Sequence, residues 1–226
     1  MKTLNALAFL MAYPSADMQI ASGEISAVLK AEGWLPAATI RKIEKFMDEC
    51  AAVDIYDLQE DYVGLFDRTP SLCLHLFEHV HGDSRDRGQA LVELDMLYRE
   101  RGLENDSEHT PDYLPLFLEY LSILPPNEAR ENLDGAIDVI AVLGERLKKR
   151  ESGYAVLFDA LQEAAARKPD LRKLQGALEF NAGFEPTQDE MDEAWEQQFA
   201  FAGTKDDNGG GCPKAQDMLK RMETGS

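Results

Sequence analysis

The chain has 226 residues and a mass of 25.3 kDa, so it is long enough to bury a hydrophobic core without disulfide or metal staples. Its 42 acidic and 23 basic residues give a formal net charge of -19, which argues against a nucleic-acid surface because phosphate binding needs the opposite sign. The cysteines, Cys50, Cys73 and Cys212, are odd in number and lack C-x-x-C spacing, which excludes an intrachain disulfide framework and indicates a reducing compartment.

The N-terminal stretch MKTLNALAFLMAYPSADMQ superficially resembles a signal peptide. Its apolar run from Ala6 to Tyr13 is short, and Pro14 ends it without a convincing cleavage site after it. We interpret it as the first core helix. No stretch reaches the roughly 18 to 20 continuous apolar residues of a membrane-spanning helix, so the sequence predicts no direct membrane insertion.

Helical spacing of apolar residues recurs along most of the chain. The clearest predicted helices cover residues 55–66, 84–102, 114–123, 127–150 and 154–161. Sustained period-2 alternation and strand-flanked Asn-Gly turns are absent from the sequence. These patterns predict an all-α fold, with a single compact multi-helix domain of about eight to ten helices joined by short loops.

The C-terminal part of the chain has a different composition. Nine of the residues between 174 and 207 are acidic and Lys205 is the sole basic one, and the following DDNGGGCPK interrupts any helix. We therefore expect a helical domain over residues 1–182 and a mobile acidic extension over residues 183–226. Within the extension, Met191, Ala194, Trp195 and Phe199 form an apolar stripe that could dock on the domain or on a partner.

One short motif raises the possibility of metal chemistry. His75, Glu78 and His79 match H-x-x-E-H, in which two histidines one helical turn apart hold zinc and the glutamate acts as general base. A catalytic site also needs a third protein ligand, which the motif does not supply. We expect Leu72, Leu76 and Val80 to form the buried stripe of this helix, which would leave the histidines near its surface.

The stretch HGDSRDRG that follows has two structural interpretations and one functional one. Gly82 can end one helix while Asp83 or Ser84 caps the next, so the stretch can be a tight turn. The charged residues 85–87 can be a solvated ion-pair cluster. Alternatively they form a polar recognition patch on a fixed corner. The sequence contains no G-x-S-x-G elbow and no phosphate-binding loop, so nucleophilic catalysis and nucleotide binding find no support.

Four blocks carry a resemblance to a known family. DYVGLFDR, SLCLHLFEHVHGDSRDRGQALVEL, PDYLPLFLEYLSILPPNEA and RLKKRESGYAVLFDAL occur in this order over roughly residues 60–162. They resemble the NarJ family of nitrate reductase assembly chaperones, which belongs with the TorD-like chaperones that mature molybdenum enzymes. In that family pattern the position of His75 is commonly apolar, so the zinc motif looks accidental.

The resemblance implies a cytoplasmic chaperone, not an enzyme, with no cofactor of its own and a role in nitrate assimilation. Its implied partner is the apo catalytic (alpha) subunit of respiratory nitrate reductase, bound as an unfolded segment through its N-terminal leader-like region. The chaperone would support insertion of the molybdenum cofactor, delay docking to the membrane subunit, and allow molybdenum cofactor biosynthesis proteins to join the complex. A zinc hydrolase and a general helical adaptor remain the alternatives.

A leader-like peptide is short, partly basic and apolar, and binds as a helix in a groove. An acidic domain offers attraction to its positive charges, and aromatic and leucine side chains offer an apolar floor. The predicted client-peptide surface comprises Tyr62, Phe66, Asp67, Glu78, His79, His81, Arg85, Asp86, Arg87, Asp112, Tyr113, Leu114, Phe117, Glu119 and Tyr120.

Overall fold

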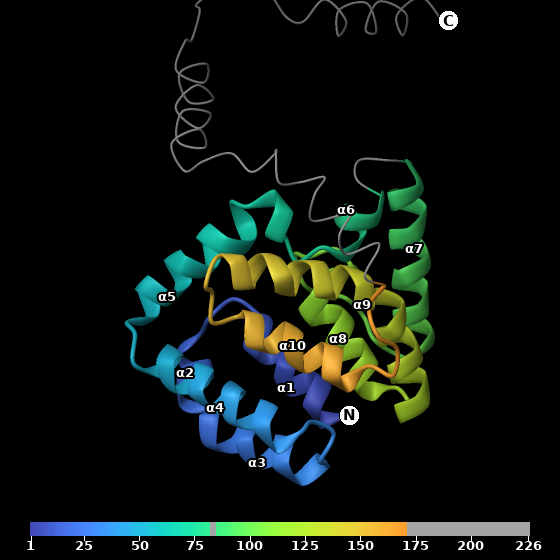
Figure 1. Cartoon of the computed structure of the whole chain (residues 1–226). Coiled ribbons are helices and arrows are strands. Elements are labelled where there is room, and N and C mark those ends of the chain that lie inside the picture. The colour runs from blue at the N-terminus through green and yellow to red at the C-terminus, as the bar shows by residue number, and fades with distance from the viewer. Residues whose placement is uncertain (82–84, 171–226) are drawn as a thin grey trace, which may run out of the picture. The chain divides into compact units, whose positions relative to one another are not determined.

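A computed structural model describes residues 1–81 and 85–170, and of His81, Arg85 and Asp86 it describes the backbone alone. Ten α-helices and no strand lie in this part of the chain, which confirms the all-α prediction (Figure 1). The α-helices are α1 (Lys2–Met11), α2 (Ala16–Ile20), α3 (Ser22–Glu32), α4 (Ala37–Ala51), α5 (Ile55–Tyr62), α6 (Leu76–His81), α7 (Arg85–Glu100), α8 (Leu114–Ile123), α9 (Pro126–Lys149) and α10 (Ala155–Ala164).

Side chains from elsewhere in the chain complete several helix ends. The backbone N–H groups of Lys2 and Thr3 begin α1 without an intrahelical acceptor, and the Glu32 carboxylate accepts both, at 3.0 and 2.6 Å. Helix α3 then ends at Gly33, whose φ of 64° is the left-handed conformation that favours glycine. Helix α5 is capped by Asp54, whose carboxylate accepts the Tyr56 N–H at 2.9 Å.

The helix predicted over residues 55–66 changes its geometry part of the way along. Its α-helical part ends at Tyr62, and one π-helical turn, η1, covers Val63–Asp67. The Arg68 N–H donates to the Val63 carbonyl five residues earlier at 2.9 Å, and the Thr69 hydroxyl donates to the Gly64 carbonyl at 2.9 Å. A short 3-10 turn, η2, follows at Pro70–Leu72. The π turn inserts an extra residue per turn and sets the direction in which the chain approaches α6.

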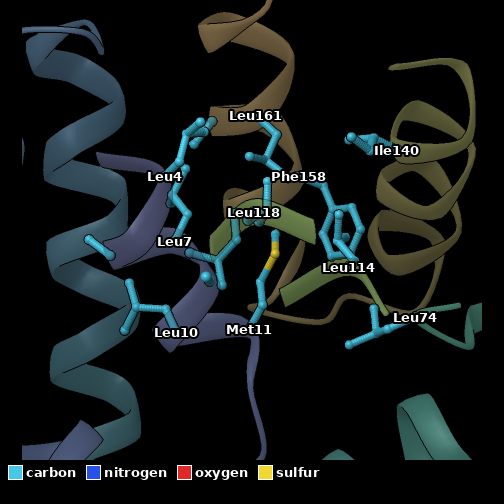
Figure 2. Close-up of a cluster of buried hydrophobic side chains, with 14 of the residues drawn as sticks. Leu4, Leu7, Leu10, Met11, Leu74, Leu114, Leu118, Ile140, Phe158 and Leu161 are labelled. Carbon is cyan, nitrogen blue, oxygen red and sulfur yellow. The ribbon is translucent and has the colours of Figure 1, made fainter. Parts of the chain in front are cut away.

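The centre of the core lies between α1 and α8, which pack directly on one another. Figure 2 shows Leu4, Leu7 and Met11 of α1 meeting side chains of α8 and α10, with Ile140 of α9 beside them. Fully buried leucines contribute about 1.5 to 3 kcal/mol each relative to exposure, so this cluster is the main source of stability. The prediction that residues 6–13 begin a core helix is therefore confirmed.

Helices α9 and α10 form a second tightly packed pair, and α10 also packs on α4. Pro126 occupies the first turn of α9, where its missing N–H costs nothing, and basic residues occupy the last turn, near the negative end of the helix dipole. A Cβ atom at Gly144 would lie 3.1 Å from the Phe158 Cβ, so glycine permits the close approach of the two helices. Phe158 itself is fully buried.

The described helices include none that is both long and apolar enough to cross a membrane. The predicted boundary at residue 182, the extension over residues 183–226 and its apolar stripe lie outside the described residues, as do Gly82, Asp83 and Ser84. These predictions stay predictions.

Candidate functional site

Two segments far apart in sequence meet beside α6. The Leu76 N–H donates to the Asp112 carbonyl at 3.0 Å, and the Leu114 N–H donates to the Leu74 carbonyl at 2.8 Å. These bonds make an isolated antiparallel bridge between His75 and Tyr113. His75 therefore precedes α6 instead of lying within it, so the H-x-x-E-H motif does not present its two histidines one helical turn apart.

Asp112 organises this junction, and its side chain is fully buried. One carboxylate oxygen accepts the Phe77 N–H at 3.0 Å, and the other faces the Thr110 hydroxyl and His75 Nδ1, the latter at 3.3 Å. Burial would raise the pKa of Asp112, but the hydrogen bonds from His75, Thr110 and Phe77 outweigh it and hold that pKa below its usual value. A buried carboxylate thus fixes the start of α6.

A ring stack covers the junction on its exposed side. His109 stacks on Tyr113 with centroids 3.9 Å apart, and His75 lies 5.5 Å from the same Tyr113 ring. Desolvation, and the neighbouring His75, lower the pKa of His109, which favours its neutral form at neutral pH. The sequence analysis missed Thr110 and His109 because no spacing relates residues 75 and 110 before the chain folds.

A second polar cluster joins the start of α6 to α7. Glu78 accepts the Cys73 thiol at 2.9 Å through one oxygen and the Arg87 guanidinium at 2.8 Å through the other. Burial alone would raise the pKa of Glu78, but the bonds from Cys73 and Arg87 lower it, so the carboxylate is charged. Burial, together with the bond to Glu78, raises the pKa of Cys73 to about 12, so the thiol stays protonated and is a poor nucleophile or metal ligand.

The imidazole of His79 is committed to the backbone of the same cluster. Its Nε2 lies 2.8 Å from the Cys73 carbonyl and must carry the proton that it donates there. Burial lowers the pKa of His79, and the nearby Arg146 lowers it further, so the ring is neutral. Among the described residues no group of three or more His, Cys, Asp or Glu side chains has the geometry to hold a metal ion. His75 and His79 thus serve separate hydrogen-bond networks.

An aromatic cluster adjoins the His75–Tyr113 bridge. The Tyr62 hydroxyl donates to the Met11 carbonyl at 2.9 Å and accepts from the Tyr113 hydroxyl at 2.9 Å. Phe66 packs 4.8 Å from Tyr62, and Tyr154 of the α9–α10 connection packs 5.2 Å from Phe66. The Tyr62–Tyr113 bond connects the π turn to the His75–Tyr113 bridge.

The structure divides the predicted client-peptide surface into three groups. The buried members are Tyr62, Phe66, Asp112, Tyr113, Leu114, Phe117 and Tyr120. The half-buried members are Glu78, His79 and Arg87, and the exposed ones are Asp67 and Glu119. The side chains of His81, Arg85 and Asp86 lie outside the described residues. The predicted aromatic floor is therefore packed in the core in this state, under a partly exposed set of charged groups.

One expectation about α6 is wrong. Leu72 and Leu76 are buried as predicted, but Val80 is 60% exposed. Helix α6 has six residues and contacts α7 and α9, and Leu76 is buried. The buried stripe therefore ends after one turn, and the half-buried His79 is directed back toward Cys73 instead of outward.

The described residues form an all-helical fold, and its class follows from its similarity to known proteins. Residues 35–160 match the family described as nitrate reductase delta subunit. The chain is 40% identical over 189 residues to the nitrate reductase molybdenum cofactor assembly chaperone NarJ of Escherichia coli, covering 84% of this chain and 80% of that protein. It is 35% identical to NarW of Escherichia coli, covering 88% of this chain and 82% of that protein.

A solved structure is similar in fold. A crystal structure described as a redox enzyme maturation protein from Archaeoglobus fulgidus superposes with a TM-score of 0.50 and 24% identity, over 70% of this chain and 88% of that one. The family match covers more than half of the chain and spans both polar clusters. The chain belongs to the nitrate reductase delta subunit family of NarJ-type assembly chaperones, and is a chaperone and not an enzyme.

Proposed function

We propose that this protein is the cytoplasmic assembly chaperone of a respiratory nitrate reductase. It binds the apo catalytic subunit, chiefly through the N-terminal segment of that subunit, while the molybdenum cofactor is inserted, and it delays docking to the membrane subunit. The observation that carries the proposal is the 40% identity to NarJ over 84% of the chain, together with a family match that includes all the predicted client-peptide residues.

The charge of the protein supports a basic client segment. A formal net charge of -19 attracts a segment with positive residues at long range. Exposed Asp67 and Glu119, and half-buried Glu78, provide negative groups around the α6–α8 junction. Since part of the binding energy is then electrostatic, affinity falls as ionic strength rises, and the apolar contacts retain the remainder.

The buried members of the predicted surface become accessible to the client if the α6–α7 corner moves. Two bridge hydrogen bonds and the Asp112 contacts join the start of α6 to the segment before α8, and the Glu78–Arg87 ion pair joins α6 to α7 within the α6–α7 corner. A client that binds the moved form better shifts the population toward it, and loss of the client closes the corner again. This arrangement gives both binding and release.

Peptide titration tests the proposal directly. A synthetic peptide with the N-terminal sequence of the cognate catalytic subunit is titrated into the full chain by calorimetry, beside a scrambled peptide of the same composition. We expect the natural sequence to bind more tightly than the scrambled one, with weaker binding at high salt. Equal binding of both peptides would favour the general helical adaptor instead.

Maturation in cells tests the α6–α7 corner. Arg87→Ala removes the partner of Glu78, but because both side chains are partly exposed the stability cost is at most about 1 kcal/mol. We expect Arg87→Ala, and Arg85→Ala, to leave the thermal midpoint near that of the wild type and to reduce nitrate reductase maturation in cells lacking the natural chaperone. Arg99→Ala, which breaks an exposed pair with Asp95 on the same helix, is the control. Normal maturation in all three variants would make the corner a structural turn alone.

A further inference from the structure

An exposed apolar surface lies where α2 and the turn before it contact the α4–α5 turn and α5. It consists of Tyr13, Ile20, Val53 and Tyr56, with exposed fractions of 51, 80, 41 and 77%. We call these four residues the α2–α5 surface. Large apolar side chains exposed singly need no explanation. These four lie on segments that are hydrogen-bonded to one another, which makes them a candidate surface for contact with another molecule.

Two glutamine side chains connect the segments that form the α2–α5 surface. Gln19 of α2 donates to the carbonyls of Cys50 and Val53 at 2.9 and 2.8 Å, and Gln59 of α5 donates to the Pro14 carbonyl at 2.8 Å. Ile20 and Val53 therefore lie beside the Gln19 hydrogen bonds, and Tyr56 lies one helical turn from Gln59. The apolar side chains are thus presented by a fixed backbone, which lowers the entropy cost of binding.

Acidic residues are frequent in the segments that form this surface, and the nearest basic residues along the chain are Lys45 and Arg68. Residues 46–67 contain seven Asp or Glu and no Lys or Arg, and residues 3–29 contain no Lys or Arg either. Asp17, Asp57, Glu60 and Asp61 are exposed, and within the described part of the chain none of them forms an ion pair. An apolar strip with an acidic rim is complementary to a segment that carries apolar and basic side chains together.

The other exposed apolar group lacks this charge pattern. On α7, Val92, Met96 and Leu97 are 55, 56 and 46% exposed. The same helix and the turn after it carry Arg99 and Arg101, with side chains 70 and 47% exposed. Both arginines are ion-paired, with Asp95 and Glu128, and residues 85–101 hold four basic and four acidic residues. A basic segment is therefore attracted to the α2–α5 surface more strongly than to the charge-balanced α7, so net charge distinguishes the two surfaces.

The α2–α5 surface is also continuous with the functional site. The exposed Tyr13 ring packs edge-on against Tyr62 with centroids 5.6 Å apart, and the Tyr62 hydroxyl is bonded to that of Tyr113 in the bridge. In Figure 1, α2 and α5 both lie on the side of the helical domain away from α7, and α2 packs on α4. A molecule bound to the α2–α5 surface thus contacts Tyr13, whose ring packs on Tyr62 of the aromatic cluster.

From this geometry we infer that the α2–α5 surface binds the apolar, basic N-terminal segment of the client. The inference rests on the proposed function and names the surface that receives that segment. Tyr13, Ile20 and Tyr56 contact the apolar residues of the segment, and Glu60 and Asp61 face its basic residues. The α6–α8 junction then responds through Tyr13 and Tyr62.

The test uses the full chain and the synthetic N-terminal peptide of the cognate catalytic subunit. The apolar variant is Ile20→Ser with Tyr56→Ser, and its matched control is Val92→Ser with Met96→Ser, which changes two comparably exposed apolar residues on α7. A charge variant, Glu60→Gln with Asp61→Asn, removes two acids near the C-terminal end of α5, where negative charge does not stabilise the helix. Its control is Glu104→Gln with Glu108→Gln, two exposed acids in the loop after α7. Thermal midpoints are measured for all four.

We expect the apolar variant to bind the peptide about tenfold more weakly and its control to remain within about twofold of the wild type. The charge variant should lose much of the salt dependence of binding, and its control should keep it. If the apolar variant fails to fold, the charge variant decides alone. The inference is overturned if variants and controls bind with equal affinity and equal salt dependence, or if the α7 control loses as much peptide affinity as the apolar variant. Either result leaves the proposed function intact. If the wild type prefers the natural peptide no more than its scrambled version, the proposed function itself fails, and this inference fails with it.

Discussion

Replacement of Asp112 tests how the α6–α8 junction is held. Its carboxylate is fully buried and accepts the Phe77 N–H at 3.0 Å, with His75 and Thr110 as further donors. Asp112→Ala removes the acceptor for all three groups and the cap of α6. Asp112→Asn keeps one carbonyl oxygen as an acceptor and removes the charge.

The magnitude follows from how well each donor can be rehydrated. A hydrogen bond to a charged group contributes about 1.5 to 3 kcal/mol when the partner stays buried. The His75 side chain is 24% exposed and Thr110 is exposed, so both recover part of that energy from water. The Phe77 N–H lies at the start of α6 and recovers less. We therefore expect Asp112→Ala to cost about 3 kcal/mol and Asp112→Asn about half of that.

Urea unfolding of the full chain, followed by circular dichroism at neutral pH, measures both free energies. With an m-value of about 2 kcal/mol/M, the Asp112→Ala midpoint falls by about 1.5 M. Asp106→Ala removes an exposed acid from the same loop and is the control, with an expected change below about 0.5 kcal/mol.

The pH dependence gives an independent check. Because the folded-state pKa of Asp112 lies below its usual value, its contribution to stability is fully present above the unfolded-state pKa of about 4 and is lost as the pH falls through the folded-state pKa. The difference in unfolding free energy between wild type and Asp112→Asn should therefore shrink below about pH 4. A difference that stays constant down to acidic pH, or a wild-type midpoint in Asp112→Ala, would refute this account of the junction.

Three further predictions concern the aromatic cluster, the buried imidazole and the C-terminal extension. Tyr62→Phe removes the bonds to the Met11 carbonyl and the Tyr113 hydroxyl and should cost about 1 to 2 kcal/mol in urea unfolding, whereas Tyr56→Phe, at a 77% exposed position, should cost almost nothing. The folded-state pKa of His79 is lowered, so as the pH falls the unfolded chain binds the proton before the folded one does. The free energy of unfolding should therefore fall as the pH drops below the usual histidine pKa of about 6.5, and His79→Gln should flatten this dependence on pH. The same dependence in wild type and variant would contradict the prediction. A chain that ends at Gly183 should keep its thermal midpoint, because the sequence beyond is acidic and interrupted by glycine; a large drop would mean that Trp195 and Phe199 complete the core.

The helices of this protein could be predicted where the signal is local. The long helix α9 has apolar residues at helical spacing, a proline in its first turn and basic residues in its last, and it forms over Pro126–Lys149. Asp54 caps α5 because its side chain reaches a backbone N–H two residues ahead. The prediction that Val80 is buried was wrong because apolar spacing alone does not show where the buried part of a helix ends. Helix α6 has six residues, and its burial ends after one turn.

By itself the sequence determined the all-helical class and, through four ordered blocks, the chaperone family. Only the tertiary structure decided what the chemistry-bearing residues do. Asp112 caps a helix 35 residues earlier in the chain, and His75 and His79 serve different networks although they are four residues apart. Such contacts depend on how two distant backbone segments are brought together, which is a property of the packed core and not of residue spacing. The same packing buries the predicted aromatic floor and leaves Tyr13, Ile20, Val53 and Tyr56 exposed.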